Sequence, residues 1–218
     1  MLFRSNLVGH PTYWIRPFAK VRSTIGHHRI YWDLRYSDPV GTDRGFAISA
    51  VYRNTPSGPQ GPYVHPGVYK VRLTVDGKST EKPISVRLDP RVSISDADLR
   101  LQTDLSMTAY DSYHQLQAIR DEIDKMKEGP KKWKKGQFDA VVALRGAGDP
   151  DGGDFLYGSI TETTLEKETV VSLQHKMLFL VNVLQSADAA PTSQMKEAIG
   201  KLTQRAKDIA AAWAVLKK

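Results

Sequence analysis

Asp33 is the first residue in this sequence whose neighbours suggest chemistry. It follows Tyr31 and precedes Arg35, and an acid close to tyrosine and arginine is what a sialidase-like or retaining glycosidase uses. Glycosidases of this kind need two carboxyl groups set across the scissile bond, about 5 to 10 Å apart. Alternation of apolar and polar residues around Asp33 explains it equally as a solvated strand residue. We therefore assign no catalytic residue.

A second group is the run of acids Asp149, Asp151 and Asp154 in a glycine-rich stretch. Carboxylate-rich turns of this type can hold calcium through oxygen ligands. The spacing does not fit an EF-hand loop, because its twelfth position would be Ile160 rather than glutamate. The sequence predicts a solvated turn, with no metal ligand and no cofactor.

A third group is the basic run Lys131 to Lys135, which is interrupted by Trp133. Lysines around an aromatic ring could grip phosphates, stack a base or touch a membrane surface. Lysines are also favoured just beyond the C-terminus of a helix, where they face its negative dipole end. We favour this structural interpretation and expect no nucleic-acid partner.

Four aromatic residues suggest a contact with carbohydrate or with a partner: Tyr13, Trp14, Tyr31 and Tyr63. Rings exposed on a small sandwich can form a stacking platform for sugars, although an analogy of fold is a weak argument for function. The alternative is that Tyr13 and Trp14 cover the edge of a sheet. We favour this alternative and keep carbohydrate binding as the second hypothesis.

Composition is that of an ordinary folded protein of 218 residues, with 40% hydrophobic and 25% charged residues. Absence of cysteine excludes disulfides, thiolate metal sites and cysteine nucleophiles. The net charge of +7 favours solubility without naming a partner. No apolar run is long enough for a membrane span, and the N-terminus lacks a secretory signal. Met1 to Ser5 is what a common adapter end encodes, so we expect residues 1–24 to be the N-terminus of a fragment.

Period-two alternation predicts strands over His28–Tyr36 and Phe46–Tyr52. Between residues 68 and 88 it continues on both sides of Asp76-Gly77, which predicts a hairpin with a type I′ turn. These strands predict a small antiparallel immunoglobulin-like β-sandwich over residues 25–92.

After Pro90 the apolar period becomes helical. A helix begins at a capping pair, Ser95 with Asp98, and ends at Gly129-Pro130. A second apolar stripe runs over residues 170–184, and Thr163 with Glu166 is its expected start signal. A third runs over residues 195–213 and follows Pro191, a residue favoured in the first turn of a helix. A short helix is also expected over 137–144. They predict an antiparallel helical bundle over residues 95–217, with a Gly/Asp-rich loop at 145–164. The predicted fold class is α+β.

Several strings resemble the C-terminal region of bacterial proteins with sortilin-like or sialidase-type (BNR, Asp-box) propellers, many of which carry a glycosyl-hydrolase label. These strings are His28–Tyr36, Pro66–Gly77, Asp89–Val92, Leu156–Ile160 and Leu184–Asp188, followed by Pro191-Thr192. The similarity runs from about His10 to the end of the chain. A propeller blade takes about 40 to 50 residues, so no propeller fits before Arg29.

The resemblance implies a secreted or periplasmic parent protein whose propeller precedes this region. It therefore implies a non-catalytic accessory module that braces the propeller or associates with another protein. Alternatives are a carbohydrate-binding module and the C-terminal fragment of a glycoside hydrolase whose active site lies in the missing propeller.

Overall fold

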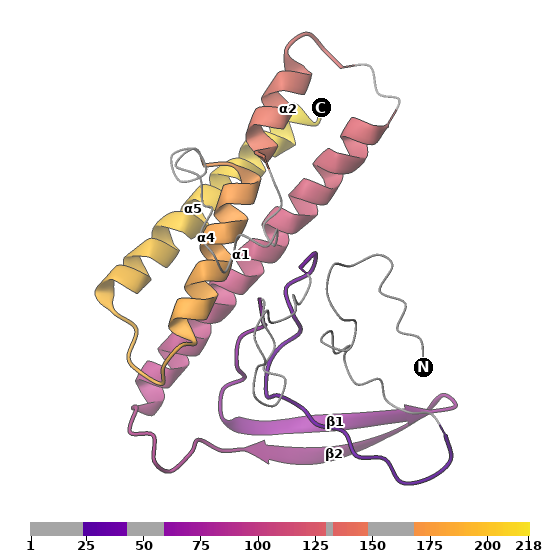
Figure 1. Ribbon diagram of the computed structural model, residues 1–218, viewed down its shortest axis with the longest axis vertical. Helices are drawn as coiled ribbons and strands as arrows, with labels where there is room; N and C mark the ends of the chain where they lie inside the picture. The colour runs from indigo at the N-terminus through magenta and orange to yellow at the C-terminus, as the bar shows by residue number, and fades with distance from the viewer. Residues whose placement is uncertain (1–23, 43–58, 130–132, 148–167) are drawn as a thin grey trace, which may run out of the picture.

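A computed structural model describes residues 24–42, 59–129, 133–147 and 168–218 of the chain (Figure 1). Within these residues the protein is α+β, with a two-stranded antiparallel sheet followed by four helices. In chain order the elements are β1 (Gly67–Val75), β2 (Lys78–Val86), α1 (Asp96–Glu128), α2 (Gln137–Arg145), α4 (Val170–Leu184) and α5 (Ser193–Leu216).

The β1–β2 hairpin forms around the turn that the sequence predicts. Asp76 and Gly77 both have positive φ angles, of 48° and 77°, as a type I′ turn requires. Strand pairing is continuous from Val75 opposite Lys78 to Gly67 opposite Val86. The predicted hairpin is therefore confirmed.

Helix α1 also begins and ends where the sequence predicts. The Ser95 side chain accepts a hydrogen bond from the backbone N–H of Asp98, which satisfies one of the free donors of the first turn. The helix ends at Glu128, and Gly129 is its C-cap. Its 33 residues give a rod about 50 Å long, along which the other helices pack.

The N-termini of α4 and α5 are fixed by threonine caps. Thr169 and Ser172 form a reciprocal capping box at the start of α4, and the Thr192 side chain accepts from the N–H of Met195 in α5. Pro191 stands just before this second cap, not in the first helical turn where the sequence analysis put it. The predicted opening pair Thr163 and Glu166 lies outside the described residues.

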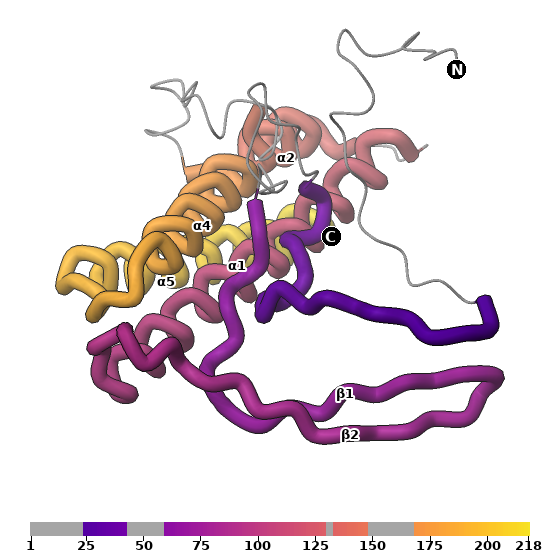
Figure 2. The backbone as a smooth tube through the Cα atoms, turned by 60° about the horizontal axis from the view of Figure 1, so that its bottom comes forward, coloured from indigo at the N-terminus to yellow at the C-terminus, as the bar shows by residue number. Residues whose placement is uncertain are grey.

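Among the described residues, the buried core residues all come from the helices. Figures 1 and 2 show α1, α4 and α5 lying lengthwise beside one another, with α2 near the C-terminal ends of α1 and α5. Helix α4 is the most buried of the four, and none of the core residues comes from β1 or β2. The buried core residues are Ala109, Tyr110, Tyr113, Leu116, Ile123, Val141, Val170, Leu173, Met177, Leu178, Leu180, Val181, Leu184, Ile199, Ala206, Ile209 and Trp213.

The strand predicted over His28–Tyr36 is wrong. The described chain makes only one isolated bridge there, between Arg35 and Tyr63, and Leu34 has a φ of 61° that no strand allows. Local hydrogen bonds explain the turn, because Asp33 Oδ1 accepts from the N–H of Arg35 and Trp32 Nε1 donates to the Arg35 carbonyl. Such side-chain bonds to nearby backbone compete with strand pairing.

Other sequence predictions fall outside the described residues. These are the strand over Phe46–Tyr52, the acidic run Asp149 to Asp154, and most of the loop at 145–164. The short helix predicted at 137–144 is confirmed as α2. Val141 is fully buried there, whereas Phe138 is 41% exposed.

Candidate functional site

Of the four predicted contact aromatics, the structure describes Tyr31 and Tyr63; Tyr13 and Trp14 lie outside the described residues. Tyr31 is 83% exposed. Tyr63 is half exposed, but the Arg35 guanidinium lies 3.5 Å from the centre of its ring. A cation on the ring face occupies the surface on which a sugar would stack. The contact that Tyr63 makes through its ring face is therefore with Arg35.

Two described segments, residues 34–42 and 59–66, form hydrogen bonds with each other and with residues of α1 and the end of α4, and we call them the tether. The segments hold each other through hydrogen bonds from Tyr36 N to the Pro62 carbonyl (2.9 Å) and from Val64 N to the Leu34 carbonyl (2.8 Å). Arg35 Nη1 adds a bond to the Gly61 carbonyl, at 2.8 Å. The tether is thus a pair of non-helical segments with its own internal bonds.

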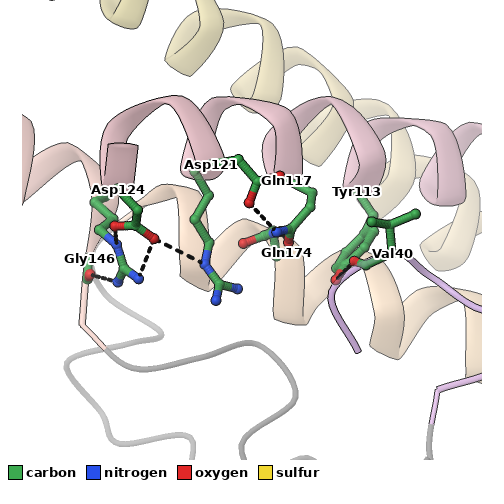
Figure 3. Close-up of polar contacts among 9 residues, drawn as sticks. Val40, Tyr113, Gln117, Asp121, Asp124, Gly146 and Gln174 are labelled. Atoms are coloured by element: carbon green, nitrogen blue, oxygen red, sulfur yellow. Dashed lines mark hydrogen bonds and ion pairs between the residues drawn. The ribbon is translucent and has the colours of Figure 1, made fainter. Parts of the chain in front are cut away.

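Tyrosines of α1 bind one segment of the tether. The Tyr110 hydroxyl donates to the Ser37 carbonyl (2.9 Å), and the Tyr113 hydroxyl donates to the Val40 carbonyl (2.8 Å; Figure 3). Both rings belong to the buried core, so their hydroxyls bring backbone of the tether onto the helix surface. Burial raises the pKa of Tyr110 above its ordinary value, with Asp111 and Asp38 adding to the effect, which keeps its hydroxyl a donor.

Side-chain amides bind the other segment. Gln185, at the end of α4, accepts from the backbone N–H of Tyr63 (2.8 Å) and donates to the Ser106 hydroxyl of α1 (2.8 Å). Buried Gln102 donates to the carbonyls of Leu184 and Ala187 and so fixes the end of α4 against α1. Buried polar groups need such partners, and here the partners also position the tether.

Gly61 marks a close backbone approach within the tether. A Cβ atom at this residue would lie 2.3 Å from the carbonyl oxygens of Tyr36 and Ser37. No real Cβ contact is this short, so the two segments can pass each other only because residue 61 is glycine.

The hairpin presents a row of uncovered apolar side chains. Side chains alternate along a strand, so Tyr69, Val71, Leu73 and Val75 of β1 share one face, with Ile84 beside them on β2. We call these five residues the apolar face. Val71, Leu73 and Val75 are 52%, 57% and 56% exposed. None of these five residues belongs to the helical core, and among the described residues the hairpin projects away from the helices (Figures 1 and 2).

The inner end of the apolar face is anchored. The Trp32 ring meets the Tyr69 ring edge-on, with centroids 5.6 Å apart, and the Tyr69 hydroxyl donates to the His65 carbonyl of the tether. Burial, and then the neighbouring Tyr36, raise the pKa of Tyr69. The hairpin is therefore attached at its inner end, while Val71, Leu73 and Val75 farther along β1 are more than half exposed.

Charged groups of the hairpin divide between its faces. Arg72 pairs with Glu81 (2.6 Å) and Lys70 approaches the same carboxylate (3.7 Å), all on the face opposite Val71. Lys78 and Lys82 lie across from Val75 and Val71, and so belong to the apolar side of the sheet.

Polar clusters elsewhere along α1 hold helices together (Figure 3). Gln174 of α4 donates to Gln117 of α1 (2.7 Å). Arg145, at the end of α2, makes two bonds to Asp124 of α1, at 2.6 and 2.9 Å. Each of these two pairs joins side chains of two different helices, so these residues have a structural role.

The remaining candidate residues make structural contacts. Asp33 accepts a hydrogen bond from the backbone N–H of Arg35, and Trp133 packs against the core beside Phe138, which supports the structural interpretation of Trp133. Burial lowers the pKa of His114, with Asp111 acting in the opposite direction. A small depression of about 160 Å³ is lined by His65 and the α1 residues Arg100, Thr103 and Asp104.

Across the described segments, no three histidine or acidic side chains gather into a group that could hold a metal. None of the helices described is both long and apolar enough to cross a membrane. Comparison with family models, curated proteins and solved structures gives no match to this chain.

Sequence reasoning found the residues of the apolar face, and the sandwich that it predicts around them stays a prediction. Their alternation reads as the inner face of a sandwich, whereas within the described residues they are open to solvent. The signal for an open face is the pair of lysines, Lys78 and Lys82, which stand on the side of β2 that a sandwich would bury.

Proposed function

We propose that this chain is a non-catalytic accessory module that binds another protein through the apolar face of its hairpin. In this proposal an antiparallel helical bundle is the scaffold, and the β region contributes one hairpin to a small immunoglobulin-like sandwich that the partner completes. The partner is the propeller domain of an exported, secreted or periplasmic parent protein, or a separate protein at the same location.

The observation that carries the proposal is an uncovered apolar face held on an anchored hairpin. A two-stranded hairpin alone is marginally stable in water, and contiguous exposed apolar residues of this kind mark interaction sites. Here Trp32, Tyr69 and the tether hold the hairpin in place while Val71, Leu73 and Val75 stay open. This arrangement suits a surface that is buried when a partner binds.

The carbohydrate-binding alternative receives less support from the geometry. Arg35 covers a face of the Tyr63 ring, so only part of this ring is free for a sugar, and Tyr31 is the more exposed of the two described rings. The hydrolase alternative places its active site outside this chain, and it predicts that the chain alone turns over no glycoside.

Photo-crosslinking from the apolar face tests the proposal. A photoreactive amino acid replaces Leu73 in the full chain, expressed in the cells from which the gene derives. The matched control carries it at Val215 of α5, an apolar residue that is 70% exposed and distant from the hairpin in the sequence. We expect one dominant protein adduct from position 73 and none from position 215.

The captured protein is then purified and titrated with the wild-type chain and with a Val71→Thr, Leu73→Thr, Val75→Thr variant. Threonine keeps strand propensity and removes much of the apolar surface. Loss of binding in the variant supports the proposal. Equal adducts from both positions, no adduct from Leu73, or undiminished binding by the variant would contradict it.

A further inference from the structure

Two lysines border the apolar face on its β2 side. In the strand register Val71 lies opposite Lys82, Leu73 opposite Thr80, and Val75 opposite Lys78. Directly opposite residues in an antiparallel pair point to the same side of the sheet, with Cβ atoms about 5 Å apart. The apolar row of β1 and the two ammonium groups therefore form one surface.

The positive charge of this surface is not compensated within the described hairpin. Both hairpin ion pairs use Glu81, which points to the opposite face, and neither includes Lys78 or Lys82. Between Gly67 and Val86 the sequence has four basic residues against two acidic ones. A partner that covers the apolar face must also accept these two ammonium groups.

We propose that the occupant of the apolar face is an acidic amphipathic segment of a partner protein. Its apolar side chains pack on Val71, Leu73 and Val75, and its carboxylates pair with Lys78 and Lys82. The inference rests on the proposed function and deepens it, because it names the chemistry that the partner segment must have. Charge complementarity of this kind sets the choice of partner and the association rate more than the affinity.

Two other occupants fit less well. A second copy of this hairpin would bring the same lysines toward one another, and like charges facing across an interface are repulsive. A lipid surface attracts lysines, but strands β1 and β2 pair only with each other in the described chain. Their outer backbone groups would lose water without gaining partners if the apolar face entered hydrocarbon.

Titration of the full chain with three synthetic peptides tests the partner chemistry. Each peptide alternates valine with a second residue, which is glutamate, serine or lysine. We expect the glutamate peptide to bind about tenfold more tightly than the serine peptide, and the lysine peptide to bind most weakly. The preference for glutamate should shrink as salt is added, because exposed charges are screened.

Matched variants locate the effect. Lys78→Gln with Lys82→Gln should abolish the preference for glutamate, whereas Lys70→Gln, on the opposite face of the same hairpin, should leave it intact. Amide chemical shifts in the hairpin report where each peptide binds.

The outcomes separate this inference from the proposed function. If all three peptides bind equally at Leu73, the inference of an acidic partner is overturned, while the proposal that the apolar face binds protein is retained. No binding of the glutamate peptide also overturns the acidic partner, while the crosslinking experiment decides the proposed function independently. Face-dependent binding to phosphatidylcholine vesicles that contain phosphatidylglycerol, without peptide binding, would assign the surface to a membrane.

Discussion

The helices and the hairpin contain the same kind of apolar row, and only the helices bury theirs. Leu173 of α4 is 0% exposed in the helical core, while Leu73 of β1 is 57% exposed. The apolar stripe of each helix packs against the apolar stripes of neighbouring helices in the same chain. The hairpin finds none within the described residues beyond Trp32 at its inner end. The contrast teaches that an amphipathic pattern predicts a face that is buried, without showing whether the same chain or another molecule buries it.

The largest expected effect comes from truncating one leucine in each region. Leu173→Ala should lower the free energy of unfolding by about 2–5 kcal/mol, because it leaves a cavity in a closed core. Leu73→Ala should change it by no more than about 0.5 kcal/mol, as for other surface substitutions. Urea unfolding of both variants measures the difference. Similar losses in the two variants would mean that the hairpin face is as buried as the core.

A smaller effect is expected at the tether, which joins the two regions. Gly61→Ala places a methyl group against two backbone carbonyl oxygens, and it should cost about 1–3 kcal/mol as overpacking does. Gly200→Ala is the matched control, because a Cβ there meets nothing within 4 Å on a helix. Alanine is the better helix former, so the control should gain up to about 1 kcal/mol. If Gly61→Ala is as stable as wild type, the two segments do not approach as described.

The smallest expected effect is a pH dependence in the helical region. Hydrogen bonds from Trp213 (2.7 Å) and then Lys217 (3.2 Å) hold the pKa of Glu122 below its ordinary value. A lowered folded-state pKa contributes stability that is present above the unfolded pKa, and that stability is lost as pH falls through the folded pKa.

Thermal unfolding between about pH 6 and pH 3 measures this contribution. The wild type should lose slightly more stability on acidification than Glu122→Gln, by under about 0.5 kcal/mol because the carboxylate is exposed. Identical pH profiles would show that the bond from Trp213 is not maintained in solution.

Sequence patterns predicted the elements whose causes are local. Ser95, Gly129 and the Asp76-Gly77 turn act through a few neighbouring residues, so their positions follow from residue type. The strand at His28–Tyr36 was predicted wrongly, because Asp33 and Trp32 bind backbone next to them and the alternation alone does not reveal this competition. The immunoglobulin-like sandwich stays a prediction.

The tether could not be predicted because its causes are long-range. The Tyr113 hydroxyl donates to the Val40 carbonyl, 73 residues away in the chain, and no local pattern around either residue reveals this bond. Gln185 is similar, because its bond to Tyr63 N spans 122 residues. The openness of the apolar face is also a property of packing, which alternation along one strand does not contain.

Thiol accessibility tests most directly whether the apolar face is open for a partner. The chain has no cysteine, so Leu73→Cys and Leu173→Cys each carry a single thiol. Under native conditions we expect Leu73→Cys to react with a maleimide nearly as fast as the unfolded chain. Leu173→Cys should react slower by about a thousandfold or more, because its thiol reacts only when the core opens. Protection of Leu73→Cys equal to that of Leu173→Cys would show that the face is already covered, and would contradict its role as a docking surface.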